Sequence, residues 1–139
     1  MDTPQLDVGE VTRLLQAAHA GEPAANKLDT ADANQRIWYL NAVSGLGLAL
    51  VAQGRAAEAR PLLESAVELS RRNLGETHLR TADARLSLGR ALLATGHYDE
   101  AEPLLLAASA VFEKQRRSQP YFAAQTEAAL AQLRARRGH

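Results

Sequence analysis

The sequence has no cysteine, few aromatic residues and no net charge, and the lack of cysteine and of net charge each excludes a class of function. Without cysteine the chain has no disulfides and no thiolate chemistry, which fits a reducing compartment. Aromatic residues make up only 4% of its 139 residues. The 16 Lys and Arg residues are balanced by 16 Asp and Glu residues, whereas electrostatic binding to nucleic acids or membrane surfaces requires a basic excess or a basic stripe. We therefore expect neither a nucleic acid nor a membrane as a partner.

Segments that would direct the chain to a membrane are also missing from the sequence. The opening stretch MDTPQLDVGE is acidic and polar, unlike a secretory signal. The longest strongly apolar run, Leu46–Ala52, is far shorter than the about 20 residues that a transmembrane helix needs. From these features we expect a cytoplasmic protein.

One stretch of the sequence is present twice. Residues 46–66 read LGLALVAQGRAAEARPLLESA, and residues 88–108 read LGRALLATGHYDEAEPLLLAA, with 12 of the 21 aligned positions identical at an offset of 42 residues. A fixed period of this size is typical of stacked repeat proteins. Because such arrays present surfaces rather than catalytic clefts, the repeat favours a binding function.

The apolar residues recur at helical spacing, and no stretch alternates with period two. The pattern predicts an N-terminal helix over Val8–Ala20 and five later helices, most of them ended by a glycine. The predicted later helices are Ile37–Gln53, Ala56–Leu74, a helix capped by Thr77 that runs to Thr95, Tyr98–Arg117 and Pro120–Arg136. We therefore expect an all-α fold.

The duplicated stretch resembles the tetratricopeptide repeat. The matching residues of the first copy are Leu46, Gly47, Leu50, Gly54, Ala59, Leu63 and Ala66, and those of the second are Leu88, Gly89, Leu92, Gly96, Tyr98, Ala101, Leu105 and Ala108. Gly47 and Gly89 would let the first helix of each pair lie close to the second, and the leucines would fill the space between helices. The resemblance implies a helical repeat array, an α–α superhelix of antiparallel helix pairs.

The longer period resembles the kinesin-light-chain type of this repeat. The phrases Leu74-Gly75-Glu76-Thr77-His78 and Glu100-Ala101-Glu102-Pro103-Leu104 are similar to that type. The chain then divides into an N-terminal helical cap at 8–33, a first repeat at 34–75, a second repeat at 76–117, and a C-terminal capping helix or degenerate third repeat at 118–137. The third copy is degenerate because Gly89 maps to Ala131.

A second resemblance concerns only residues 8–28. Val11-Thr12-Arg13-Leu14-Leu15-Gln16, followed by Ala20-Gly21-Glu22, is similar to the opening helix of extracytoplasmic-function sigma factors. The aliphatic and basic continuation that would contact RNA polymerase is missing. The competing interpretation is an amphipathic helix that caps the array.

Residue patterns for catalysis or metal binding are absent from the sequence. The four histidines lie far apart, and none is spaced from another ligand as a zinc helix requires. No nucleophile elbow, phosphate-binding loop or dinucleotide fingerprint is present. We expect no enzyme activity, no cofactor and no metal.

The best candidate site is the concave groove that the resemblance implies, lined by the first helix of each pair. The residues predicted to line it are Asn41, Ser44, Leu48, Asp83, Leu86, Ser87, Arg90, Gln125 and Gln132. Relatives that grip a peptide carboxylate use Lys and Asn at two of these places, and here that pair is absent. A groove of mixed polar and apolar residues predicts a peptide or a helix as the ligand.

Three functions follow from this interpretation. The first is a non-catalytic interaction module that binds a protein or peptide partner in the groove. The second is self-association, as a homodimer or scaffold, because repeat arrays must cover their apolar ends. The third is a regulatory fragment in bacterial transcription or signalling, either sigma-like or similar to the repeats that end bacterial kinases.

Overall fold

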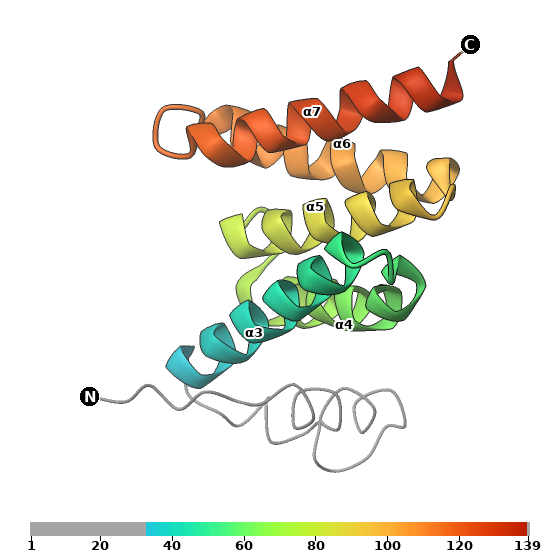
Figure 1. Ribbon diagram of the computed structural model, residues 1–139. Coiled ribbons are helices and arrows are strands. Elements are labelled where there is room, and N and C mark those ends of the chain that lie inside the picture. Colours follow the sequence, from blue (N-terminus) through green and yellow to red (C-terminus); the bar gives the residue numbers. More distant parts are fainter. Residues whose placement is uncertain (1–32, 139) are drawn as a thin grey trace.

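A computed structural model describes residues 33–138, with side chains from Leu40 onward. This part of the chain forms α3 (Ala33–Ala52), α4 (Ala56–Leu74), α5 (Leu79–Ala94), α6 (Tyr98–Lys114) and α7 (Pro120–Arg137) (Figure 1). The predicted cap at 8–33 and the sigma-like stretch at 8–28 lie outside the described residues, except for Ala33.

The prediction of an all-α repeat fold is confirmed, because the described residues form five helices and no strand. The bounds of α4 agree with the prediction, while α3 begins at Ala33 rather than Ile37. The prediction that Thr77 caps α5 is wrong by one residue. His78 is the N-cap, and its Nδ1 accepts a hydrogen bond from the Arg80 backbone N–H at 3.1 Å.

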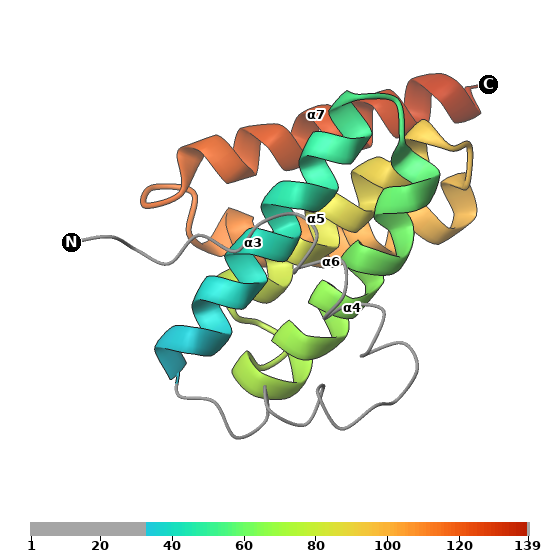
Figure 2. The ribbon, with the colours of Figure 1, turned by 60° about the horizontal axis from the view of Figure 1, so that its bottom comes forward.

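The helices stack in chain order, from α3 and α4 at one end to α7 at the other (Figure 1). Each helix packs on the next along the chain, and α5 also contacts α3 and α7. Helix α5 contacts both α3 and α7, while α4 packs on α3 and α5, and α6 packs on α5 and α7 (Figure 2). Because four helices surround α5, only a narrow strip of it reaches solvent.

Two glycines lie where neighbouring helices approach closely. A Cβ added to Gly47 would lie 2.7 Å from Leu63 Cγ, and one added to Gly89 would lie 2.6 Å from Leu105 Cδ2. Both leucines are completely buried. The two crossings are equivalent at the 42-residue offset, so each repeat places a leucine of its second helix against a glycine of its first.

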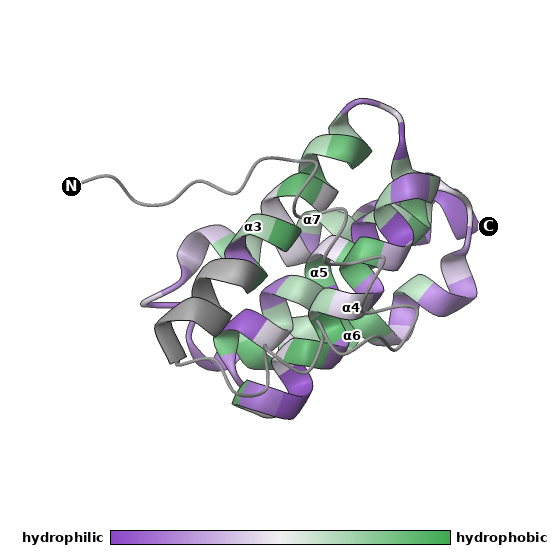
Figure 3. Ribbon diagram, turned by 90° about the horizontal axis from the view of Figure 1, so that it is seen from below, coloured by the Kyte–Doolittle hydropathy of each residue, from purple (hydrophilic) through white to green (hydrophobic). Residues whose placement is uncertain are grey.

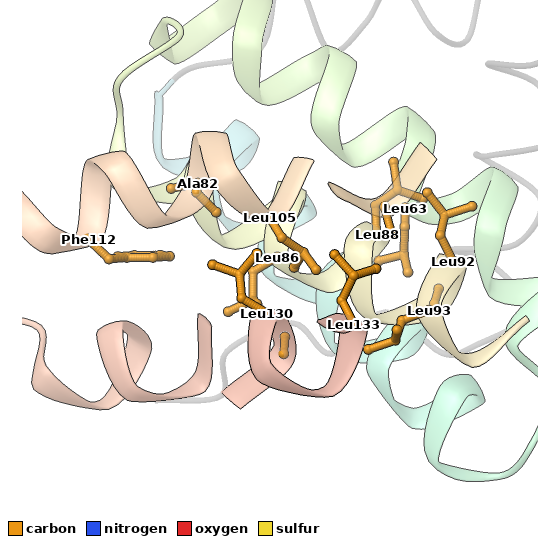
Figure 4. Packing of buried hydrophobic residues seen from close by; sticks show 14 of the residues in the cluster. Leu63, Ala82, Leu86, Leu88, Leu92, Leu93, Leu105, Phe112, Leu130 and Leu133 are labelled. Carbon is orange, nitrogen blue, oxygen red and sulfur yellow. The ribbon is translucent and has the colours of Figure 1, made fainter. Parts of the chain in front are cut away.

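The core consists mainly of leucine and alanine from all five helices. Figure 4 shows Leu86 of α5, Leu105 of α6 and Leu130 of α7 gathered at one centre, with Phe112 farther along α6. Hydrophilic residues concentrate at the loops and helix ends (Figure 3). Small side chains at the crossings let the leucines interdigitate, which is the dense packing expected of a protein interior.

Candidate ligand-binding groove

Helices α3, α5 and α7 line one side of the stack, with one hollow near the N-terminal end of α5 and another near its C-terminal end. The first hollow has a volume of about 380 Å³ and is lined by Asn41, His78, Leu79, Arg80, Asp83, Phe112, Gln119 and Phe122. The second has a volume of about 280 Å³ and is lined by Val51, Arg90, Leu93, Ala94, Gln132 and Arg136. We call these two hollows together the α3–α5–α7 groove.

The first hollow combines a carboxylate with an aromatic wall. Arg80 donates a hydrogen bond from Nη1 to Asn41 Oδ1, which links α5 to α3. Asp83 is half-buried, and burial raises the pKa of its carboxyl, while the positive charge of Arg80 acts in the opposite direction. Phe112 and Phe122 stack with ring centroids 5.3 Å apart and form the apolar side. The hollow thus offers an acceptor beside apolar surface.

The second hollow gathers cationic groups from two helices. Arg90 of α5 and Arg136 of α7 are both exposed, and within residues 33–138 neither forms an ion pair. Val51 and Leu93 provide the apolar part of the lining. Guanidinium groups without a carboxylate partner are free to bind an acidic group of a ligand.

A third hollow, of about 460 Å³, lies on a different side of the molecule. It is lined by Glu76, Thr77, Arg85, Ala107, Ala110, Val111, Lys114 and Gln115. Here Glu76 forms an ion pair with Arg85 and a longer one with Arg71, at 3.5 Å. Because Glu76 and Arg85 pair with each other, this hollow is the weaker candidate for a charged ligand.

The structure distributes the predicted groove residues unevenly. Asn41 and Asp83 line the first hollow, and Arg90 and Gln132 line the second. Ser44, Leu48 and Gln125 are half-buried and line none of the three hollows.

The prediction that Leu86 and Ser87 line the groove is wrong, because both side chains are buried. Their exposed fractions are 3% and 1%, so both belong to the interior of the molecule. The reason is the central place of α5, whose exposed strip includes Arg90 but excludes the positions that face neighbouring helices.

Sequence reasoning missed several lining residues, and one signal would have found some of them. Val51, Leu93 and Arg136 each lie three or four residues beyond a predicted groove position on the same helix face. Extending the predicted groove residues of each helix by one helical turn toward its C-terminal end would have included all three. Phe122 gives no such signal, because its place depends on how α7 packs against α6.

The described residues hold neither a metal-ligand cluster nor a membrane-spanning helix. Among residues 33–138, no cluster of three or more histidine, aspartate or glutamate side chains has the geometry to hold a metal ion. None of the helices in this part of the chain combines the length and apolar character needed to cross a membrane.

Comparison with known proteins gives a family match. A model of the family described as "Tetratricopeptide repeat" matches residues 38–114. No curated protein and no solved structure matches the sequence significantly. The kinesin-light-chain type of repeat and the sigma-factor resemblance therefore stay predictions. Since the matched region spans more than half of the 139 residues and coincides with α3 to α6, the chain belongs to the tetratricopeptide repeat family.

Proposed function

We propose that this protein is a non-catalytic interaction module that binds a peptide or helix of a partner protein in the α3–α5–α7 groove. Repeats of this family generally serve as protein–protein interaction modules. A cytoplasmic location belongs to the same proposal, because the chain lacks cysteine.

The observation that carries the proposal is the pair of hollows on one side of the stack, with different charged groups at each. Asp83 lies in the first and offers a carboxylate. Arg90 and Arg136 lie in the second and offer guanidinium groups. A ligand with a donor group at one end and an acidic group at the other would satisfy both hollows.

The spacing of these groups sets the length of the ligand. Asp83 and Arg90 are seven residues apart on α5, which corresponds to about 10 Å along a helix axis. An extended peptide covers that distance with about three residues, and a bound helix covers it with about two turns. The groove therefore suits a short linear segment with opposite charges at this separation.

A binding experiment with selected peptides tests the proposal. Peptides that bind the full chain would be selected from a displayed random library. Their affinities would then be measured by titration calorimetry. Arg90→Glu should weaken binding by about tenfold or more, because it places a carboxylate where the ligand's acidic group binds. Arg136→Glu should weaken binding as well, because Arg136 lines the same hollow.

Arg117→Glu is the matched control, since it makes the same charge reversal at an exposed residue that lines none of the hollows. The control should bind like the wild type. If the selected peptides bind Arg90→Glu and Arg136→Glu as tightly as they bind the control, the groove is not the binding site.

A further inference from the structure

The last helix of the described chain leaves one of its faces open, where the equivalent face of α5 is covered. The four residues of this outer face of α7 are all exposed: Ala124, Ala128, Ala131 and Ala135. At the 42-residue offset, their equivalents on α5 are all buried: Ala82, Leu86, Gly89 and Leu93. The same register positions thus face neighbouring helices in α5 and solvent in α7.

The repeats show what kind of helix occupies such a face. Leu63 of α4 packs against Gly47 of α3, and Leu105 of α6 packs against Gly89 of α5. Ala131 is the equivalent residue of α7 and is exposed. A helix with a leucine in the place of Leu63 and Leu105 would fit this open position.

The chain contains one more segment with the sequence pattern of α4 and α6. The three segments share the pattern Glu-x-x-x-Leu-Leu-x-x-Ala, which reads EARPLLESA at 58–66, EAEPLLLAA at 100–108 and EVTRLLQAA at 10–18. In this alignment Leu15 takes the place of Leu63 and Leu105. Residues 8–20 lie outside the described part of the chain, and their apolar spacing predicts a helix.

We infer that residues 8–20 of one copy of the chain dock as a helix on the outer face of α7 in a second copy, so that copies assemble head to tail. Leu15 would lie over Ala131 at the position where Leu105 lies over Gly89, with the docked helix set slightly farther from α7 because Ala131 has a methyl group and Gly89 has none. In the stack each second helix of a pair, such as α4, contacts both the helix before it and the helix after it. The docked segment would in the same way join α7 of one copy to α3 of the next.

Charge at the ends of the two elements supports this occupant. Consecutive helices of the stack are antiparallel, with the first turn of α6 beside the last turn of α5, where His97 N–H bonds to the Leu92 carbonyl at 2.8 Å. In the same arrangement the acidic start of the segment, with Asp7 and Glu10, would lie beside the last turns of α7. There Arg134 stands where α5 has Leu92, so this end of the open face is basic.

The assembly has a defined geometry because its two contact surfaces differ. One surface is the segment and the other is the α7 face, so every copy offers both. Such a heterologous contact produces rings or open chains rather than symmetric dimers. The wild-type chain should therefore exceed the mass of a dimer as its concentration rises, when measured by light scattering after size-exclusion chromatography.

A pair of complementary variants of the full chain tests the contact. Ala131→Glu blocks the α7 face and keeps the segment, while Leu15→Glu blocks the segment and keeps the α7 face. Each variant alone should lose at least about tenfold in association, because a carboxylate would be buried at the contact. An equimolar mixture of the two should form a 1:1 dimer and nothing larger, since each partner has one working surface.

Two control variants add the same charge elsewhere. Ala110→Glu lies on the exposed surface of α6, and Gln16→Glu introduces the residue that α4 has at the equivalent position, Glu64. Both should assemble like the wild type. Circular dichroism establishes that each variant is folded, and if Leu15→Glu does not fold, loss of assembly in Ala131→Glu but not in Ala110→Glu supports the proposal.

Several results would overturn the inference. A wild-type chain that stays monomeric at the highest attainable concentration excludes the assembly. Assembly by Ala131→Glu equal to that of Ala110→Glu excludes the α7 face. Folded Leu15→Glu that still self-associates shows that α7 pairs with another surface, such as α7 of a second copy. A mixture of folded variants that remains monomeric excludes the complementary contact.

Discussion

Leu105 occupies the space that a side chain at Gly89 would need. A Cβ on Gly89 would lie 2.6 Å from Leu105 Cδ2 and 3.7 Å from the Ala101 carbonyl oxygen, and both Leu105 and Ala101 are completely buried. Leu63 stands in the same relation to Gly47. The absence of a side chain at these glycines is therefore a packing requirement of the repeat.

Gly89→Ala should lower the stability of the protein. The added methyl group forces Leu105 out of its place in a packed core, at a cost of about 1–3 kcal/mol, which exceeds the gain of about 1 kcal/mol in helix propensity. We expect a net loss of about 1 kcal/mol in the free energy of unfolding, measured by urea denaturation.

Gly45→Ala is the matched control for this prediction. Gly45 is exposed on α3, and a Cβ built on it would meet nothing within 4 Å. The substitution should therefore raise the free energy of unfolding by about 0.5–1 kcal/mol. Equal effects of Gly45→Ala and Gly89→Ala on the free energy of unfolding would show that the close approach of Leu105 to Gly89 does not affect stability.

Leu105→Ala should be among the most destabilising substitutions in the described chain. The side chain is completely buried between α5 and α6, so its removal leaves a cavity and costs about 2–5 kcal/mol. The neighbouring Leu106 is 49% exposed, and Leu106→Ala should cost less than about 1 kcal/mol. Thermal denaturation of both variants measures the contrast, and similar losses would contradict the packing described here.

Thr81 makes a buried hydrogen bond that joins a helix to the preceding loop. Its side chain is completely buried, and Oγ1 donates to the Gly75 carbonyl oxygen at 2.7 Å. Thr81→Val removes this donor with little change of shape and should cost about 1–2 kcal/mol, because the link between α5 and the loop is lost.

Thr126→Val is the control for Thr81→Val. Thr126 is also buried, but its hydroxyl donates to the Phe122 carbonyl oxygen within the same helix. That oxygen also belongs to the backbone hydrogen bonding of α7, so the loss should stay below about 0.5 kcal/mol. If urea denaturation gives a loss for Thr126→Val as large as that for Thr81→Val, the contact with Gly75 does not stabilise the loop.

The repeat could be predicted from the sequence because its determinants are local. Gly54 and Gly96 end helices with positive φ angles of 77° and 81°, a conformation that favours glycine. The cap of α5 could not be predicted in the same way. Thr77 and His78 are both polar, and only the extended backbone of His78, with φ −72° and ψ 145°, places its ring to accept from Arg80.

The groove was only partly predictable, because exposure depends on which helices surround a residue. Asp83 and Arg90 lie on the exposed strip of α5, as helical spacing predicts. Leu86 lies between them in sequence but faces neighbouring helices, where it packs near Leu130 and Leu105 (Figure 4). The periodicity of one helix does not reveal how many neighbours it has.

Asp83 should make stability depend on pH in the direction opposite to most surface carboxylates. Burial raises the pKa of Asp83 in the folded state above its unfolded value, so the folded state binds more protons in this range. The contribution of Asp83 to the free energy of unfolding therefore falls as pH rises from the unfolded to the folded pKa. Asp83→Asn does not titrate, so its stability relative to the wild type should be higher at pH 7 than at pH 3.

Glu68→Gln is the matched comparison with the opposite sign. A hydrogen bond from Arg71 lowers the pKa of Glu68, so its stabilising contribution is present at neutral pH and is lost as pH falls. Relative to the wild type, Glu68→Gln should therefore be less stable at pH 7 than at pH 3. Urea denaturation of both variants at the two pH values measures these trends. An Asp83→Asn difference that is equal at both values, or larger at pH 3, would show that the carboxyl is not desolvated in the groove.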